Sequence, residues 1–157
     1  MKLLMIVLVI GFVLITVGIW WIARSSQHGS PPGLVNGKLA PCPQRPNCIT
    51  SETFPDRIDY IAPINTEAIS ADVAFDTYQQ ALKNLGGEVS FTEQNYLAAT
   101  FTSALFGFVD DVEVRQDSQS HQLHYRSASR VGHYDFGANR KRLRLLFDEY
   151  NNILVAR

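Results

Sequence analysis

Hydrophobic positions divide the chain into one uninterrupted N-terminal run and a longer region of short periodic segments. Of the twenty residues from Leu3 to Ile22, only Gly11, Thr16 and Gly18 are not hydrophobic. A helix of this length rises about 30 Å, which is the thickness of the hydrocarbon core of a bilayer. The run therefore predicts a transmembrane helix, and we assign residues 1–24 as a membrane anchor.

The residues after the run bear on the alternative of a cleaved signal peptide. A signal peptide has a shorter apolar region and ends at a small-x-small cleavage site. Here the run ends in Trp20-Trp21, and no convincing site of that kind follows. Tryptophan favours the membrane–water interface, so an uncleaved anchor is the preferred interpretation. Residues 25–41 are rich in Ser, Gly and Pro, which predicts a flexible linker.

Periodic segments over residues 42–157 predict a two-layer α+β domain. Ser70 can cap a helix whose apolar positions recur at helical spacing, and Gly86-Gly87 ends it. Asn139 can cap a second helix with an apolar stripe from Leu143 to Ile153. Strands are predicted within residues 57–64 and over 88–91, 96–103, 108–116 and 121–129. Short turns between consecutive strands predict an antiparallel sheet of about five strands, with both helices on one face.

The turn at Asp117-Ser-Gln-Ser predicts a register for the last hairpin. On one face, Val114 would oppose Leu123 and Val112 would oppose Tyr125. On the other face, Glu113 would oppose His124 and Asp111 would oppose Arg126, with Arg115 and Arg130 beside them. Asp110 falls among the apolar residues, opposite Ser127, where a carboxylate needs a hydrogen bond or a charged partner. The polar face is either a self-paired ladder or a ligand-binding face.

Charge is distributed unevenly, although the formal net charge is only −1. Residues 48–125 hold twelve acidic and three basic side chains, whereas residues 126–157 hold seven basic and three acidic ones. The near-neutral total argues against nucleic acid as a partner. Arg140, Lys141 and Arg142 open the final helix, where positive charge is unfavourable. Their counter-charge is either internal, such as Asp135, or external: an anionic small molecule or a lipid headgroup.

Two cysteines, Cys42 and Cys48, lie close together in a proline-rich loop. An even, closely spaced pair indicates a disulfide in an oxidising compartment, and the alternative is two unrelated thiols in a reducing one. No second Cys/His pair has metal-ligand spacing, so neither a metal nor a cofactor is expected. With the short tail before the apolar run, these features favour a single-pass protein of the bacterial inner membrane whose C-terminal domain lies in the periplasm.

The stretch from Arg126 to Arg142 (RSASRVGHYDFGANRKR) resembles the signature of an uncharacterised bacterial and plastid family, catalogued as domain of unknown function 1499. Pro46-Asn-Cys48 with Ser51, and Phe108-Val-Asp-Asp-Val-Glu113, fit the same family. The resemblance implies no reaction. It implies that the motif includes Asp110, Asp111, Glu113, Arg126, Ser127, Ser129, Arg130, Asp135, Asn139 and Arg140.

Three functional hypotheses follow. The first is a membrane-anchored, non-enzymatic binding module with an anion-binding patch around Arg126, Arg130 and Arg140; its ligand-binding residues would also include Ser127, Ser129, Asp135 and Asn139. The second is a hydrolase- or lyase-type enzyme that uses Asp111, Glu113 and His124 for acid–base work, which requires a cleft over that face. The third is a structural partner in a membrane-protein complex.

Overall fold

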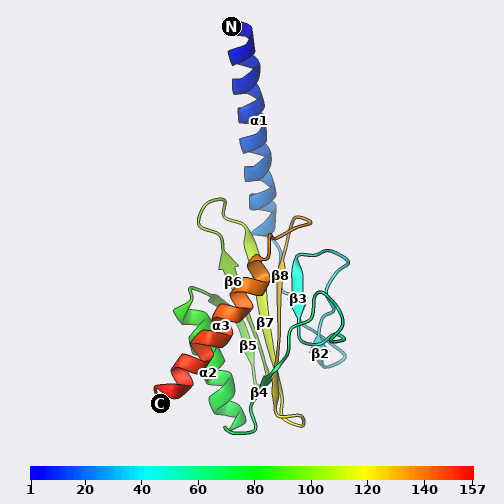
Figure 1. The fold of residues 1–157 in the computed structure, drawn as a ribbon, viewed down its shortest axis with the longest axis vertical. Coiled ribbons are helices and arrows are strands. Elements are labelled where there is room, and N and C mark those ends of the chain that lie inside the picture. Colours follow the sequence, from blue (N-terminus) through cyan, green and yellow to red (C-terminus); the bar gives the residue numbers. More distant parts are fainter.

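An apolar helix projects from a small folded domain. The computed structural model describes residues 1–157, and helix α1 covers Lys2–Ser26. This helix is long and apolar enough to cross a membrane, and it extends alone from one end of the domain (Figure 1). Its buried residues, Ala23 and Ser26, both lie in the last turn.

The domain is built on an antiparallel sheet in the order β3-β8-β7-β6-β5. Its four long strands are β5 (Glu88–Glu93), β6 (Tyr96–Thr102), β7 (Val109–Asp117) and β8 (Gln122–Ser129). Two short strands, β3 (Cys48–Thr50) and β4 (Ile64–Asn65), both pair with β8. The predicted α+β class and the antiparallel sheet are therefore confirmed.

The short strand predicted within residues 57–64 is wrong. Only Tyr60 forms a bridge there, with Thr50, and β4 starts at Ile64. The edge strand is instead β3, which sequence analysis did not assign because it has three residues and lies among prolines. So short a segment becomes a strand only because β8 offers it hydrogen-bonding groups, and its own pattern carries little signal.

Helices α2 (Ala71–Asn84) and α3 (Ala138–Val155) cover one face of the sheet, as predicted (Figure 1). The Ser70 side chain accepts a hydrogen bond from the backbone N–H of Val73, so it caps α2 as expected. Apolar side chains from both helices meet Leu97, Val112, Val114, Leu123 and Tyr125 in the main core. Along β7, these core residues alternate with the polar side chains Asp111, Glu113 and Arg115 of the opposite face.

The hairpin β7–β8 has the predicted faces but not the predicted register. Asp117 pairs with Gln122, so the loop holds four residues, and the pairs Glu113–Arg126, Val114–Tyr125 and Arg115–His124 follow. The Asp117 carboxylate accepts the backbone N–H groups of Gln119 and Ser120, which stabilises this longer loop. The pairing differs from the expected one by two residues, so each side chain keeps its face and changes its partner. Asp110 accordingly opposes Ser129 instead of Ser127.

The opposite face of the sheet is covered by the segment for which the sequence predicts a flexible linker. Strands β1 (Leu34–Val35) and β2 (Lys38–Leu39) form a small hairpin around Asn36-Gly37, both of which have positive φ. Leu39 and Leu34 pack on Tyr96 and Ala98 of β6. Part of the linker is therefore ordered against the domain, and the polar face of the sheet lies beneath it.

Candidate functional site

Glu113 and Arg126 form an ion pair at the centre of the polar face. They are directly opposite on β7 and β8, and Arg126 Nη1 lies 2.7 Å from Glu113 Oε2. The other carboxylate oxygen accepts hydrogen bonds from the Tyr96 hydroxyl at 2.8 Å and from the backbone N–H of Gly33 at 2.9 Å. Glu113 has no exposed surface. It therefore has no oxygen open to a substrate, and its role in this geometry is to hold three segments together.

His124 does not join the carboxylates with which the enzyme hypothesis grouped it. It opposes Arg115, and its Nδ1 atom lies 3.2 Å from Ser51 Oγ and 3.9 Å from Glu52 Oε1. Ser51 Oγ also accepts the backbone N–H of Tyr125 at 2.9 Å. Arg115 pairs with Glu52, whose other oxygen accepts the backbone N–H of Leu39. This second cluster fastens β3 and the N-terminal hairpin to the sheet and forms no acid–base pair with Glu113.

Burial lowers the pKa of His124 below its ordinary value of 6.5, so the folded state favours the neutral imidazole. As pH falls through this range, the unfolded chain takes up the proton first, and folding stability decreases. Between about pH 7.5 and about pH 5.5, the stability of the protein should therefore decline more steeply than that of His124→Gln. Urea unfolding at a series of pH values measures both slopes. Equal slopes would contradict this assignment.

Asp111 and Arg130 connect the sheet to the end of α1. Arg130 Nε lies 2.9 Å and 3.0 Å from the two Asp111 oxygens, and Nη2 lies 2.7 Å from one of them. Its remaining nitrogen, Nη1, donates to the carbonyl of Ser26 at 3.1 Å. A helix C-terminus presents unpaired carbonyls and negative character, which a guanidinium satisfies. Ser26 Oγ in turn accepts the backbone N–H of Val109 at 3.0 Å.

A glycine permits the chain after α1 to pass close to this pair. A Cβ atom at Gly29 would lie 2.8 Å from Cδ of Arg130. This side chain cannot move away easily, because its guanidinium is held by Asp111 and by the Ser26 carbonyl. The close approach requires the absence of a side chain at this position. The last turn of α1, the residues after it and the start of the signature loop thus form one packed unit.

Asn139 is not the N-cap of the final helix, contrary to the prediction. It lies inside α3 and is fully buried, and the N-cap is Gly137. Asp135 supplies the capping oxygens: Oδ2 accepts the backbone N–H of Asn139 at 2.8 Å, and Oδ1 accepts that of Gly137 at 3.0 Å. The helix start is therefore already occupied by a carboxylate of the same loop.

The Asn139 side chain joins the signature loop to the sheet. Its Nδ2 donates to the carbonyl of Asn47 and to Ser129 Oγ, each at 3.0 Å, and to Asp135. Its Oδ1 accepts from Ser127 Oγ at 2.6 Å. Ser127 and Ser129 thus act here as hydrogen-bonding partners in a buried network, and neither contacts a histidine that could activate it as a nucleophile.

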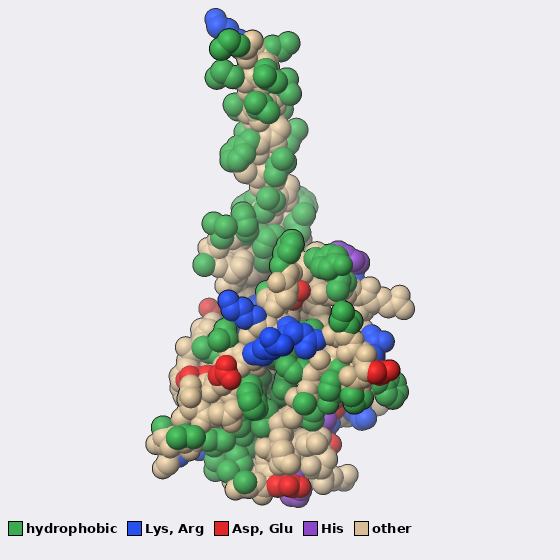
Figure 2. Space-filling view, viewed as in Figure 1, with side chains coloured by type: hydrophobic (Ala, Val, Ile, Leu, Met, Phe, Trp, Pro, Cys, Tyr) green, Lys and Arg blue, Asp and Glu red, His purple; other side chains and the backbone are tan.

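The basic cluster at the start of α3 is partly neutralised from within the protein. Arg142 pairs with Asp110 at 2.7 Å, which gives that carboxylate its partner on the apolar face. Arg140 donates to the backbone carbonyls of Tyr60 and Ile58. Lys141 and Arg144 remain exposed and form no ion pair. Figure 2 shows Lys and Arg side chains gathered over this half of α3.

The guanidiniums of Arg126, Arg130 and Arg140 are each engaged by protein groups, so the structure does not present them as an open patch. Arg144 instead borders a groove of about 440 Å³. Its lining is formed by Ile61, Ala62, Pro63, Tyr125, Arg144, Phe147 and Asp148. No group of His, Cys, Asp or Glu side chains is arranged to hold a metal ion.

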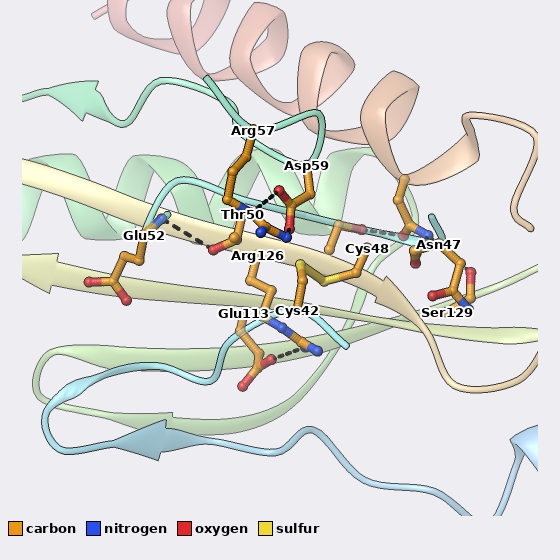
Figure 3. The surroundings of a disulfide bond; sticks show 12 residues. Cys42, Asn47, Cys48, Thr50, Glu52, Arg57, Asp59, Glu113, Arg126 and Ser129 are labelled. Carbon is orange, nitrogen blue, oxygen red and sulfur yellow. Dashed lines mark hydrogen bonds and ion pairs between the residues drawn. A yellow bond between two sulfur atoms is a disulfide. The ribbon is translucent and has the colours of Figure 1, made fainter. Parts of the chain in front are cut away.

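Cys42 and Cys48 form the predicted disulfide. Figure 3 shows it near the Glu113–Arg126 pair, with Thr50 and Asn47 on the same short segment. Cys48 opposes Ala128 on β8, so the bond closes a small loop onto the edge of the sheet. The disulfide therefore holds β3 and residues 42–47, which precede it, beside the polar face of the sheet.

The double variant Cys42→Ser/Cys48→Ser should lose about 2 kcal/mol of folding stability, the chain-entropy value for so short a loop. Denaturant unfolding of the oxidised protein and of the variant measures this difference. Reduction of the unmodified protein should lower its stability by a similar amount and leave the variant unchanged. If the reductant shifted both proteins equally, the effect would not come from this bond.

These features define a small α+β domain carried on a single N-terminal apolar helix, with a buried polar network between its sheet and its N-terminal segment. The chain belongs to the family described as "Protein of unknown function (DUF1499)", which matches residues 38–149. The resemblance of the signature to that family is thus confirmed. The match begins in the covering hairpin and extends into α3. No curated protein sequence matches the chain.

Two participants in this network, Glu52 and Gly33, were not predicted from the sequence, and Asn47 was named only as part of the Pro-Asn-Cys motif. Asn47 lies in that motif and Glu52 follows Ser51, and it is the pairing of β3 with β8 that brings both to the sheet. Gly33 contributes only its backbone N–H, for which a residue type gives no signal. The one available clue was Asn36-Gly37, a dipeptide that commonly forms hairpin turns.

Proposed function

We propose that the protein is a single-pass, membrane-anchored and non-enzymatic binding module. The observation that carries this proposal is the junction at Ser26, where the apolar helix ends inside the domain. Arg130 and Val109 both bind Ser26, and Ala23 is buried one turn earlier. An apolar helix whose end is integrated into the fold supports an anchor that is retained, because removal of a signal peptide would leave Arg130 without this partner.

The disulfide supports a location of the domain in an oxidising compartment, such as the periplasm of a bacterium with the anchor in its inner membrane. Alkaline extraction of membranes tests the anchor. The protein should remain in the membrane fraction with its N-terminus intact. Recovery of a soluble, shortened protein would refute the retained anchor.

For the ligand, we propose an anionic amphiphile that places its charged group at Arg144 and its apolar part in the groove beside Phe147. The support is chemical complementarity: Arg144 is exposed and forms no ion pair, and it borders a lining that is mainly apolar, with Asp148 as its one acidic residue. The carboxylates proposed for an enzyme are occupied by arginines, so the binding module is favoured over a hydrolase or lyase.

Octyl phosphate is a suitable probe for this groove. Titrated into the full-length protein in phosphatidylcholine nanodiscs, it should bind, and Arg144→Ala should weaken binding by about tenfold, the value of one charge-assisted contact. Arg45→Ala is the matched control, since Arg45 is also exposed but lies in the proline-rich loop. If octanol bound as tightly as octyl phosphate, or if Arg144→Ala bound octyl phosphate as tightly as the unmodified protein, there would be no anion site in this groove.

A further inference from the structure

Two loops at the α1 end of the domain carry large hydrophobic side chains that the fold leaves exposed. In the loop between β6 and β7, Leu105 is 81% exposed and Phe106 is 48% exposed. In the loop between β8 and α3, Tyr134 is 66% exposed and Phe136 is 98% exposed. None of these four side chains lines the groove beside Phe147 or takes part in the polar network described above. Exposed aromatic residues on neighbouring loops indicate a surface that contacts something else.

Both loops lie beside the last turns of α1 (Figure 1). Leu105 and Phe106 line a shallow groove together with Thr16, Ile19 and Trp20. The other loop begins at Arg130, which binds the carbonyl of Ser26. Figure 2 shows hydrophobic side chains at the base of the helix, continuous with those along it.

The groove that the first loop shares with Thr16 and Ile19 indicates the depth of this loop along the helix. Both residues lie within the apolar run from Leu3 to Ile22, about two to three turns before Ser26. If this run spans a bilayer, a loop that borders the same groove as Thr16 and Ile19 is at the level of the lipid. Trp20 and Trp21, both exposed, mark the interface at the same height.

Phe136 supplies an independent observation. Its φ of 52° lies in the left-handed region, which a bulky L-residue rarely adopts because of its Cβ atom. The neighbouring Asp135–Gly137 hydrogen bond stabilises this turn. The conformation nevertheless gives Phe136 no packing inside the domain. An unfavourable backbone that projects an aromatic ring away from the protein is typical of a residue with an external contact.

We propose that the loops 103–107 and 131–137 insert Leu105, Phe106, Tyr134 and Phe136 into the lipid bilayer at the boundary between headgroups and acyl chains. The occupant of this surface is therefore lipid of the leaflet in which α1 ends. The inference rests on the proposed membrane anchor and extends it: the domain contacts the membrane at three places and has a fixed orientation on it. Arg24 and His133, which lie beside these aromatic residues, then reach the headgroup layer.

Quenching of tryptophan by lipids brominated on the acyl chain near the headgroup tests this proposal. The full chain with Trp20→Phe and Trp21→Phe serves as a background, to which Phe136→Trp, Leu105→Trp or Val155→Trp is added singly. Phe136 and Val155 are both nearly fully exposed, so neither change removes packing, and Val155 lies at the far end of α3 (Figure 1). A fourth variant, Trp21→Phe alone, retains Trp20 as a probe of the anchor.

In vesicles of phosphatidylcholine and phosphatidylglycerol, brominated lipid should quench Phe136→Trp and Leu105→Trp by about twofold or more, as expected for side chains 5–10 Å deep. Val155→Trp should not be quenched. If Trp20 is quenched but the two loop variants behave like Val155→Trp, the loop insertion is wrong and the anchor stands. If Trp20 is not quenched either, the anchor and the loop insertion are both wrong.

Discussion

Replacement of Glu113 by alanine is expected to destabilise the domain by about 3–5 kcal/mol, the cost of leaving a buried partner charge uncompensated. Glu113 is fully buried, and its loss removes the ion pair with Arg126 and the hydrogen bonds from Tyr96 and Gly33. The Arg126 guanidinium would remain buried without a counter-charge. For a domain of this size, the melting temperature should fall by roughly 10 °C or more.

Denaturant unfolding of the full chain, with thermal melting as a second readout, measures this effect. Glu113→Gln should lose less, because its amide oxygen can still accept hydrogen bonds from Tyr96 and Gly33, although the charge is lost. The double variant Glu113→Leu/Arg126→Met should recover much of the stability, since an apolar pair can replace a buried ion pair. A loss below about 1 kcal/mol for Glu113→Ala, the value of an exposed pair, would contradict the buried network.

Replacement of Arg130 by alanine should cost about 2–4 kcal/mol and loosen the end of α1. Asp111 would lose its bidentate ion pair with the guanidinium, and the Ser26 carbonyl would lose its hydrogen-bond donor. Arg130→Lys should be intermediate, because an ammonium cannot span both Asp111 oxygens and also reach Ser26. Lys141→Ala, which removes an exposed cation of the same signature without an ion pair, is the matched control.

Hydrogen exchange provides the specific readout for this variant. The backbone N–H of Val109 donates to Ser26 Oγ, so its exchange should accelerate in Arg130→Ala. Exchange in the centre of α2 should accelerate only in proportion to the global loss of stability. If Val109 showed no acceleration beyond that of α2, Arg130 would stabilise the domain without holding the helix end.

The local elements could be predicted from the sequence because each has a strong signal of its own. Ser70 and Gly86-Gly87 delimit α2, and the apolar stripe of α3 gives Leu143, Leu146 and Tyr150 to the core. Alternation along β7 and β8 also placed every side chain on the correct face, because the side-chain period of a strand is two.

The partners of the polar residues could not be predicted in the same way. Glu113 meets Arg126 because Asp117 stabilises a four-residue loop, and a two-residue difference in register was enough to replace the expected histidine. Asp111 meets Arg130 because β7 and the loop after β8 converge on the end of α1. Such choices depend on geometry over many residues, which composition and spacing do not encode locally.

The sequence by itself determined the apolar helix, the α+β class and the family, and it favoured the disulfide, because hydrophobic periodicity, a long signature and cysteine spacing are local properties. Only the tertiary structure decided that residues 33–40 cover the polar face and that the signature arginines are engaged within the protein. The physical reason is that burial and charge compensation belong to segments far apart in the chain. The polar residues of β7 and β8 would have the same sequence pattern in an open ligand site and in a buried network. Only the position of residues 33–40 over this face distinguishes the two.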